Sequence, residues 1–125
     1  MADSDALPDG LDAEALARAE AALDRLSRDY PRWLRADIAA ARACLTPPAD
    51  RDRLYTIIHD IKGQAGSFGY PLVSRIGQDL CRMLTEDAPP PERITPLLEA
   101  MEIIIDHGLT DDGGEMGREL LARLD

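Results

Sequence analysis

The sequence predicts an all-α fold, an antiparallel bundle of helices joined by short loops. Hydrophobic residues make up 45% of the chain but aromatic residues only 4%. A core must therefore consist mainly of Leu, Ile and Ala, which favour helices over strands. Apolar residues also recur at alternating steps of three and four, the period of one helix face. No stretch shows the sustained alternation of a half-buried strand.

The beginning of the chain differs in composition from the rest. Residues 1–10 are acidic and include Pro8 and Gly10, and we expect them to form a flexible tail. The total length of 125 residues suits a single helical domain, which we expect over 11–125. A helix is predicted from about Asp12, whose carboxylate can accept hydrogen bonds from the first turn.

Pro31 interrupts this first helical stretch. Proline lacks an N–H and its ring clashes with the preceding turn, so either one helix bends there or a second helix begins. We favour two helical segments that share a face, and Thr46-Pro47-Pro48 ends the second. The apolar residues before the proline are Leu16, Ala19, Leu23, Leu26 and Tyr30, and those after it are Leu34, Ile38, Ala41 and Leu45.

Four more helices follow, separated by residues typical of turns. Their predicted ranges are about 50–68, 71–84, 95–107 and 115–124. Gly69 suits a left-handed C-terminal cap, the prolines of 88–91 form a stiff connector, and 108–114 is a polar loop. We expect the last helix to bury Leu120, Leu121 and Leu124.

Charge and cysteine content exclude several classes of function. The formal net charge is −10, and an acidic surface repels nucleic-acid phosphates and anionic lipids. The sequence has no apolar run of membrane-spanning length and no hydrophobic signal core near its start, so we expect a cytoplasmic protein. Cys44 and Cys81 lie far apart in sequence, and we expect buried, reduced thiols.

The most informative helix is the one predicted over 50–68. At about 100° per residue, the centre of its apolar stripe lies roughly 210° from His59. His59 should therefore point away from the core, toward solvent. The stripe consists of Leu54, Ile57, Ile58, Ile61, Ala65 and Phe68.

The neighbours of His59 on that exposed face are Lys62, Gly63 and Gly66. A glycine inside a helix costs about 1 kcal/mol relative to alanine, and two on one exposed face indicate clearance for another macromolecule. A neutral imidazole is a nucleophile, and a nearby ammonium stabilises the charge of a transferring phosphoryl group. The residues alone thus indicate an interaction site.

The pattern His59-x-x-Lys62-Gly63, with Gly69 after five further residues, resembles the signature of histidine phosphotransfer (HPt) domains. The preceding Leu-Tyr-Thr-Ile-Ile and the small residues Ala65 and Gly66 are also similar to that family. The resemblance implies an antiparallel four-helix bundle, here with an additional N-terminal helix and a short C-terminal helix. It also implies a two-component phosphorelay, in which the histidine carries a phosphoryl group between aspartates of receiver domains.

The resemblance also implies roles for individual residues. His59 would be the phosphoacceptor, Lys62 would stabilise phosphoryl charge, and Gly63 would provide clearance. The receiver-docking face would comprise Gly63, Gly66, Gln64, Ser67 and Gly69, together with Gln78 and Arg82. One position departs from the family, because Cys81 stands where many members have a Gln or Glu facing the histidine.

The expected partners are response-regulator receiver domains and a hybrid histidine kinase, with the chain itself a monomer. Any Mg²⁺ would belong to the receiver, so no cofactor is expected in this chain. The sequence has no P-loop and no glycine-rich nucleotide lid, so we predict a phosphoryl carrier rather than an ATP-using enzyme.

Two alternatives stay open. One is a helical adaptor that binds a receiver or histidine kinase without carrying phosphate. The other is a small metal-binding protein that uses His59, His107 and the cysteines, although their spacing is not clustered. For His107 we expect a simpler role beside the C-terminus of a helix, where a positive charge is favourable.

Overall fold

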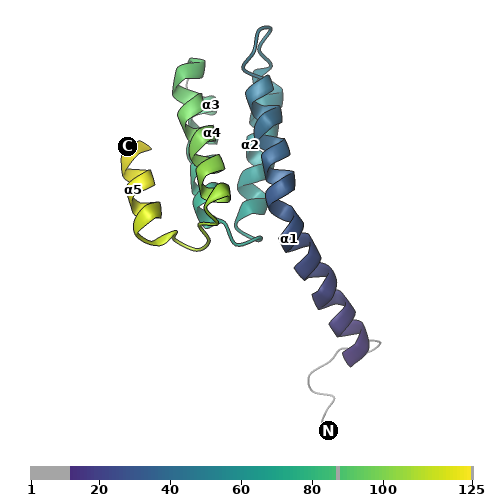
Figure 1. Cartoon of the computed structure of the whole chain (residues 1–125). Coiled ribbons are helices and arrows are strands. Elements are labelled where there is room, and N and C mark those ends of the chain that lie inside the picture. Colours follow the sequence, from purple (N-terminus) through teal and green to yellow (C-terminus); the bar gives the residue numbers. More distant parts are fainter. Residues whose placement is uncertain (1–11, 87, 125) are drawn as a thin grey trace. The chain divides into compact units, whose positions relative to one another are not determined.

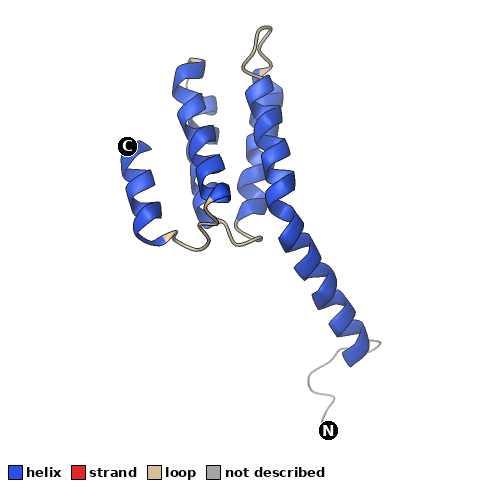
Figure 2. Ribbon diagram, viewed as in Figure 1, coloured by secondary structure: helices blue, strands red, loops and turns tan. Residues whose placement is uncertain are grey.

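The computed structural model describes residues 12–86 and 88–124. The tail predicted over 1–10 lies outside the described residues. Within the described part every regular element is an α-helix, and no strand occurs, which confirms the all-α prediction (Figures 1 and 2). The helices are α1 (Ala13–Ala43), α2 (Arg51–Ala65), α3 (Pro71–Glu86), α4 (Pro91–Asp106) and α5 (Gly114–Leu124).

α1 is one helix of 31 residues with Pro31 inside it, so the favoured prediction of two separate segments is wrong. Proline removes one main-chain hydrogen bond and adds a local clash. The sequence on both sides is rich in Ala, Leu and Arg, which are strong helix formers. Their combined preference outweighs the single lost hydrogen bond, so the helix continues through the proline.

The chain divides into two compact units, Met1–Pro31 and Arg32–Asp125. In the first unit, Asp12 caps α1 as predicted, because its Oδ1 accepts a hydrogen bond of 2.7 Å from the Ala15 N–H. Three leucines of this unit stay accessible: Leu23 is 61% exposed, and Leu16 and Leu26 are about two-fifths exposed.

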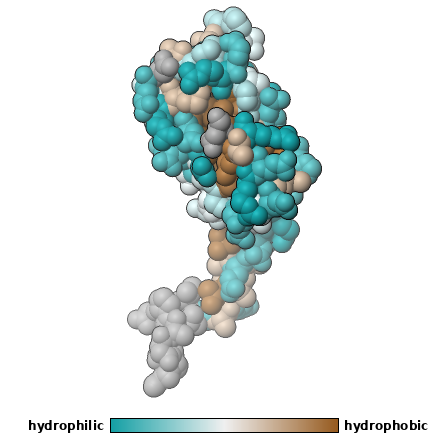
Figure 3. All heavy atoms as spheres, turned by 90° about the vertical axis from the view of Figure 1, so that its left-hand side faces the viewer, coloured by the Kyte–Doolittle hydropathy of each residue, from teal (hydrophilic) through white to brown (hydrophobic). Residues whose placement is uncertain are grey.

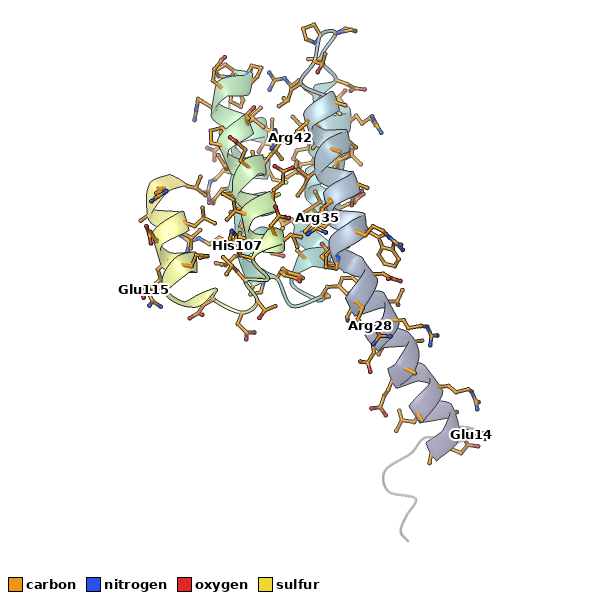
Figure 4. The ribbon with its side chains drawn as sticks, in the orientation of Figure 1. Glu14, Arg28, Arg35, Arg42, His107 and Glu115 are labelled. Carbon is orange, nitrogen blue, oxygen red and sulfur yellow. The ribbon has the colours of Figure 1, made fainter. Side chains whose placement is uncertain are left out.

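In the second unit, α2 and α3 form a closely packed antiparallel hairpin, α3 also contacts α4, and α4 contacts α5 (Figure 1). The Ala43 end of α1 is tied to α4 by two ion pairs. Arg35 Nη2 lies 3.0 Å from Asp106 Oδ1, and Arg42 pairs with Glu102; Figure 4 labels both arginines. Because all four side chains are substantially exposed, each pair is worth only about 0.2–1 kcal/mol.

The core of the second unit is entirely apolar among the described residues, and no polar or charged residue is classed as buried there. Each helix from α1 to α4 contributes one buried face. The largest fully buried side chains of this unit are Leu34, Ile38, Leu54, Ile58, Ile61, Ile76, Leu80, Ile94, Leu98, Met101 and Ile104.

α4 begins at Pro91, four residues before its predicted start. Pro91 occupies the first helical position, where the missing N–H has no partner to lose and the fixed φ suits a helix. Pro96 then lies inside the helix rather than in its first turn. Pro91 thus marks the beginning of α4, whereas Pro96 is tolerated in its interior.

α5 contacts the rest of the unit differently from the prediction. Leu120, Leu121 and Leu124 are only partly buried, and Gly117 is the one buried residue of this helix. A Cβ on Gly117 would collide with the carbonyl oxygen of Asp112 and lie 3.0 Å from Leu72 Cδ1. The helix therefore approaches through its backbone, near its start, and its leucines remain at the edge of the core.

Polar side chains dominate the face drawn in Figure 3, with a smaller apolar area between them. In the part of the chain that the structure describes, no helix is long and apolar enough to cross a membrane.

Candidate functional site

The site is built on α2, whose first turn is capped by Asp50 through a hydrogen bond of 3.1 Å from the Arg53 N–H to Oδ1. Four residues of the predicted apolar stripe are fully buried, namely Leu54, Ile58, Ile61 and Ala65. Ile57 and Phe68 are half-buried. His59 is exposed on the opposite side, as the rotation of the helix predicts.

Tyr55 lies one turn before His59 and stacks against it. The two ring centroids are 6.0 Å apart and the ring planes differ by 29°. Tyr55 is half-buried, whereas His59 is exposed. Tyr55 also lines a cleft of about 450 Å³ between the start of α2 and the end of α3, together with Arg51, Asp52, Thr56, Leu84, Thr85, Ala88 and Pro89.

Lys62 lies at a close approach of α2 and α3. A Cβ built on Gly77 of α3 would be 3.1 Å from Lys62 Cβ and 3.3 Å from Lys62 Cα. Gly77 is buried and Lys62 is half-buried. The absence of a side chain at Gly77 therefore lets α2 and α3 approach closely at Lys62, and a larger residue would push the two helices apart.

Cys81 occupies the same face of α3, one turn beyond Gly77. Burial raises the pKa of its thiol, and the positive charge of Lys62 partly opposes that rise in pKa. Position 81, where the resemblance noted in the sequence implies Gln or Glu, thus places a buried, protonated thiol within electrostatic reach of Lys62. Both cysteines are free and buried, which confirms the prediction of buried thiols.

Ser74 of α3 is inserted into the hydrogen-bond ladder of α2. Its hydroxyl donates to the Lys62 carbonyl at 2.7 Å and accepts from the Gly66 N–H at 2.9 Å. In an uninterrupted helix these two groups would bond directly to each other. The hydroxyl replaces that bond and fastens the end of α2 to α3.

The turn after α2 then closes on Gly69. Gly69 has φ +91°, its N–H donates to the Gly66 carbonyl, and the Tyr70 N–H donates to the Ala65 carbonyl. This pair of bonds is the Schellman pattern, with glycine in the left-handed position. The predicted left-handed cap at Gly69 is confirmed, and its place on a docking face stays a prediction.

The two glycines next to His59 differ in their surroundings. A Cβ on Gly63 would meet no atom within 4 Å, whereas one on Gly66 would lie 3.4 Å from Ser74 Oγ. Both are exposed. Internal packing therefore does not require glycine at position 63, and the open surface there is available to another molecule.

The other predicted docking residues are all exposed: Gln64 on α2, Ser67 in the following turn, and Gln78 and Arg82 on α3. Arg82 Nη2 donates to Asp79 Oδ1 of its own helix at 2.7 Å, so its guanidinium is engaged within α3. The α2–α3 hairpin brings positions 62, 66, 74, 77 and 81 together. The docking role of Gln78 and Arg82 stays a prediction.

An acidic pair lies beside the site. Asp60 follows His59 on α2, and Asp37 comes from the part of α1 in the second unit. Burial raises the pKa of Asp37, and the negative charge of Asp60 raises it further. The two carboxylates are therefore close enough to repel each other.

Three residues of the site were missed by the sequence interpretation: Tyr55, Ser74 and Gly77. A signal existed for two of them, because Ser74, Gly77 and Cys81 place small residues at steps of three and four on one face of α3. Such a face indicates close approach of a neighbouring helix. Tyr55 lies at i−4 from His59, a spacing that brings side chains into contact.

His107 is separate from this site. It is the C-cap residue of α4, is exposed, and lines a smaller cleft with Ile103, Met116, Glu119, Leu120 and Arg123; Figure 4 labels it. Among the described residues, no cluster of three or more His, Cys, Asp or Glu side chains could hold a metal ion.

Comparisons of the chain with models of protein families, with curated proteins and with solved structures found no match.

Proposed function

We propose that this chain is a histidine phosphotransfer protein, in which His59 accepts a phosphoryl group from a receiver-domain aspartate and passes it to another receiver. The observation that carries the proposal is the surface of α2. An exposed imidazole lies in mid-helix with Lys62 on the next turn and an open surface at Gly63. Nothing among the described residues requires that openness.

The chemistry follows from these groups. The lone pair of a neutral imidazole nitrogen attacks phosphorus of the aspartyl phosphate, an N–P bond forms, and the P–O bond to the aspartate breaks. The carboxylate leaves with the electron pair, and the imidazole releases its remaining N–H proton to solvent. The ammonium of Lys62 stabilises the negative charge on the phosphoryl oxygens, while Mg²⁺ would be supplied by the receiver.

The proposed function also implies an architecture, a set of partners and a cellular location. We assign a four-helix bundle to the Ala43 end of α1 with α2, α3 and α4, to which the Ala13 end of α1 and the short α5 are additions. Cytoplasmic receiver domains and a hybrid histidine kinase would be the partners, and the chain would act as a monomer. The buried apolar faces of four helices support this assignment.

The test is transfer of radiolabel from a panel of phosphorylated receiver domains to the full chain. We expect label on the parent protein, with the acid lability of a phosphoramidate, and none on His59→Gln. His107→Gln is the matched control, because it removes the other histidine and should accept label normally.

The outcome that overturns the proposal is equally clear. If His59→Gln accepts label as well as the parent, or if no receiver transfers label to either, His59 is not a phosphoacceptor. The adaptor alternative predicts a specific version of this result, in which the receivers bind and regulation of the partner is unchanged by His59→Gln.

A further inference from the structure

Side chains on an α-helix tilt toward its N-terminus. The imidazole of His59 therefore lies over the preceding turn, and that turn carries Tyr55. The ring centroids are 6.0 Å apart and the planes are inclined by 29°, an offset stack of the kind that aromatic rings prefer.

The two rings are not equally anchored. Tyr55 is half-buried and lines the cleft between the start of α2 and the end of α3, whereas His59 is exposed. An exposed side chain alone exchanges rotamers within picoseconds to nanoseconds. A stacked, better-anchored ring favours one of those rotamers.

The opposite side of the imidazole is bounded differently. Lys62 belongs to the following turn, and its Cα and Cβ lie against Gly77 of α3. The imidazole therefore has an aromatic ring on the side of the helix N-terminus, and the next residue of the same face in the other direction is Lys62.

We infer that Tyr55 is a positioning residue for His59, whose ring holds the imidazole in the rotamer that presents a nitrogen to an incoming phosphoryl group. The inference rests on the proposed function of His59. Alignment matters because phosphoryl transfer needs the attacking and leaving atoms in line, and a small misplacement of a reacting group costs much of the rate.

The aromatic ring carries this role, and the tyrosine hydroxyl does not. Tyr55→Phe keeps the stacked ring. Tyr55→Leu removes the ring but keeps an apolar side chain of moderate size. Tyr70→Leu is the matched control, because Tyr70 is also half-buried but lies in the turn between α2 and α3. His107 serves as an internal reference in every sample.

The first measurement is the χ1 rotamer distribution of His59, from three-bond NMR couplings of the full chain. The second is the rate at which phosphoramidate, a small phosphoryl donor, labels His59. We expect one dominant rotamer in the parent, Tyr55→Phe and Tyr70→Leu. In Tyr55→Leu we expect averaged couplings and labelling that is roughly tenfold slower, with the couplings of His107 unchanged.

Unchanged couplings and an unchanged labelling rate in folded Tyr55→Leu would overturn the inference, as would a loss in Tyr55→Phe equal to that in Tyr55→Leu. Far-ultraviolet circular dichroism identifies a variant that fails to fold, and the comparison of Tyr55→Phe with the parent then decides. If no receiver phosphorylates the chain, the proposed function fails, but the couplings and the rate of ethoxycarbonylation by diethyl pyrocarbonate still decide whether Tyr55 orients His59.

Discussion

Gly77 of α3 lies directly against Lys62 of α2, so close that a single added methyl group would be 3.1 Å from the lysine Cβ. The contact fixes the position of the Lys62 Cα and Cβ against α3, and it is possible because Gly77 has no side chain. Several consequences can be measured.

Gly77→Ala should destabilise the protein. Alanine in a helix normally gains about 1 kcal/mol over glycine, but overpacking a close contact costs about 1–3 kcal/mol. The nearest atoms include the Lys62 backbone, which cannot move aside cheaply. We expect the free energy of unfolding to fall by about 1 kcal/mol, measured by urea denaturation. A rise in stability would show that α2 and α3 separate easily.

Gly63→Ala should have the opposite effect on stability and impair function. A Cβ at position 63 meets no atom of the chain, so the helix should gain about 0.5–1 kcal/mol. If the proposed function holds, the same methyl group would enter the surface that a receiver has to approach, and the rate of phosphotransfer from the receiver should fall. Labelling by phosphoramidate, which is small, should be nearly unchanged. Equal loss with both donors would contradict a docking role for this surface.

Ser74→Ala should loosen the end of α2. The variant removes the hydroxyl that bonds both the Lys62 carbonyl and the Gly66 N–H, and we expect a loss of about 1 kcal/mol. The amide of Gly66 should also exchange faster with deuterium, because its bonding partner is gone. Ser67→Ala, at an exposed position in the next turn, is the matched control and should change neither quantity.

Asp37→Asn should stabilise the protein at neutral pH. Burial, and then the charge of Asp60, raise the pKa of the folded Asp37 carboxyl above its ordinary value of 3.8. The folded protein therefore holds that proton more tightly than the unfolded chain, and Asp37 favours folding more as pH falls through its raised pKa toward 3.8. The advantage of the asparagine variant should shrink over that window and vanish below it.

Denaturation of the Asp37→Asn variant at several pH values checks this window. Asp60→Asn should also raise the free energy of unfolding, because it removes the same repulsion between the two carboxylates. The double variant should therefore gain less stability than the sum of the two single gains. Full additivity would mean that the two carboxylates do not interact.

Much of the fold could be predicted because the apolar periodicity is strong. The stripe of α2, the left-handed turn at Gly69 and the exposure of His59 all follow from residue spacing and helix geometry. The prolines could not be interpreted so simply. Pro31 and Pro96 lie inside helices, whereas Pro91 begins one, since helix propensity and packing around each proline decide its effect.

The site was predictable on α2 and not across to α3. Local spacing places Lys62 and Gly63 beside His59, but it gives no information about which residue of another helix lies opposite. The small residues Ser74, Gly77 and Cys81 indicate that some helix approaches α3 closely, but the three-dimensional hairpin was needed to show that they contact α2 at Lys62 and Gly66. The burial expected for the α5 leucines failed for a related reason, because contact is made by the backbone at Gly117.

The insertion of Ser74 into the ladder of α2 has a consequence for transplantation of this surface into another scaffold. A 15-residue peptide with the sequence of α2 would be only marginally helical in water, and it would lack both the hydroxyl that seals its last turn and the glycine under its lysine. Grafting the residues of α2 alone onto a foreign helix would reproduce the sequence motif without the α3 contacts that stabilise it. The smallest segment to transfer is the α2–α3 hairpin with its turn intact.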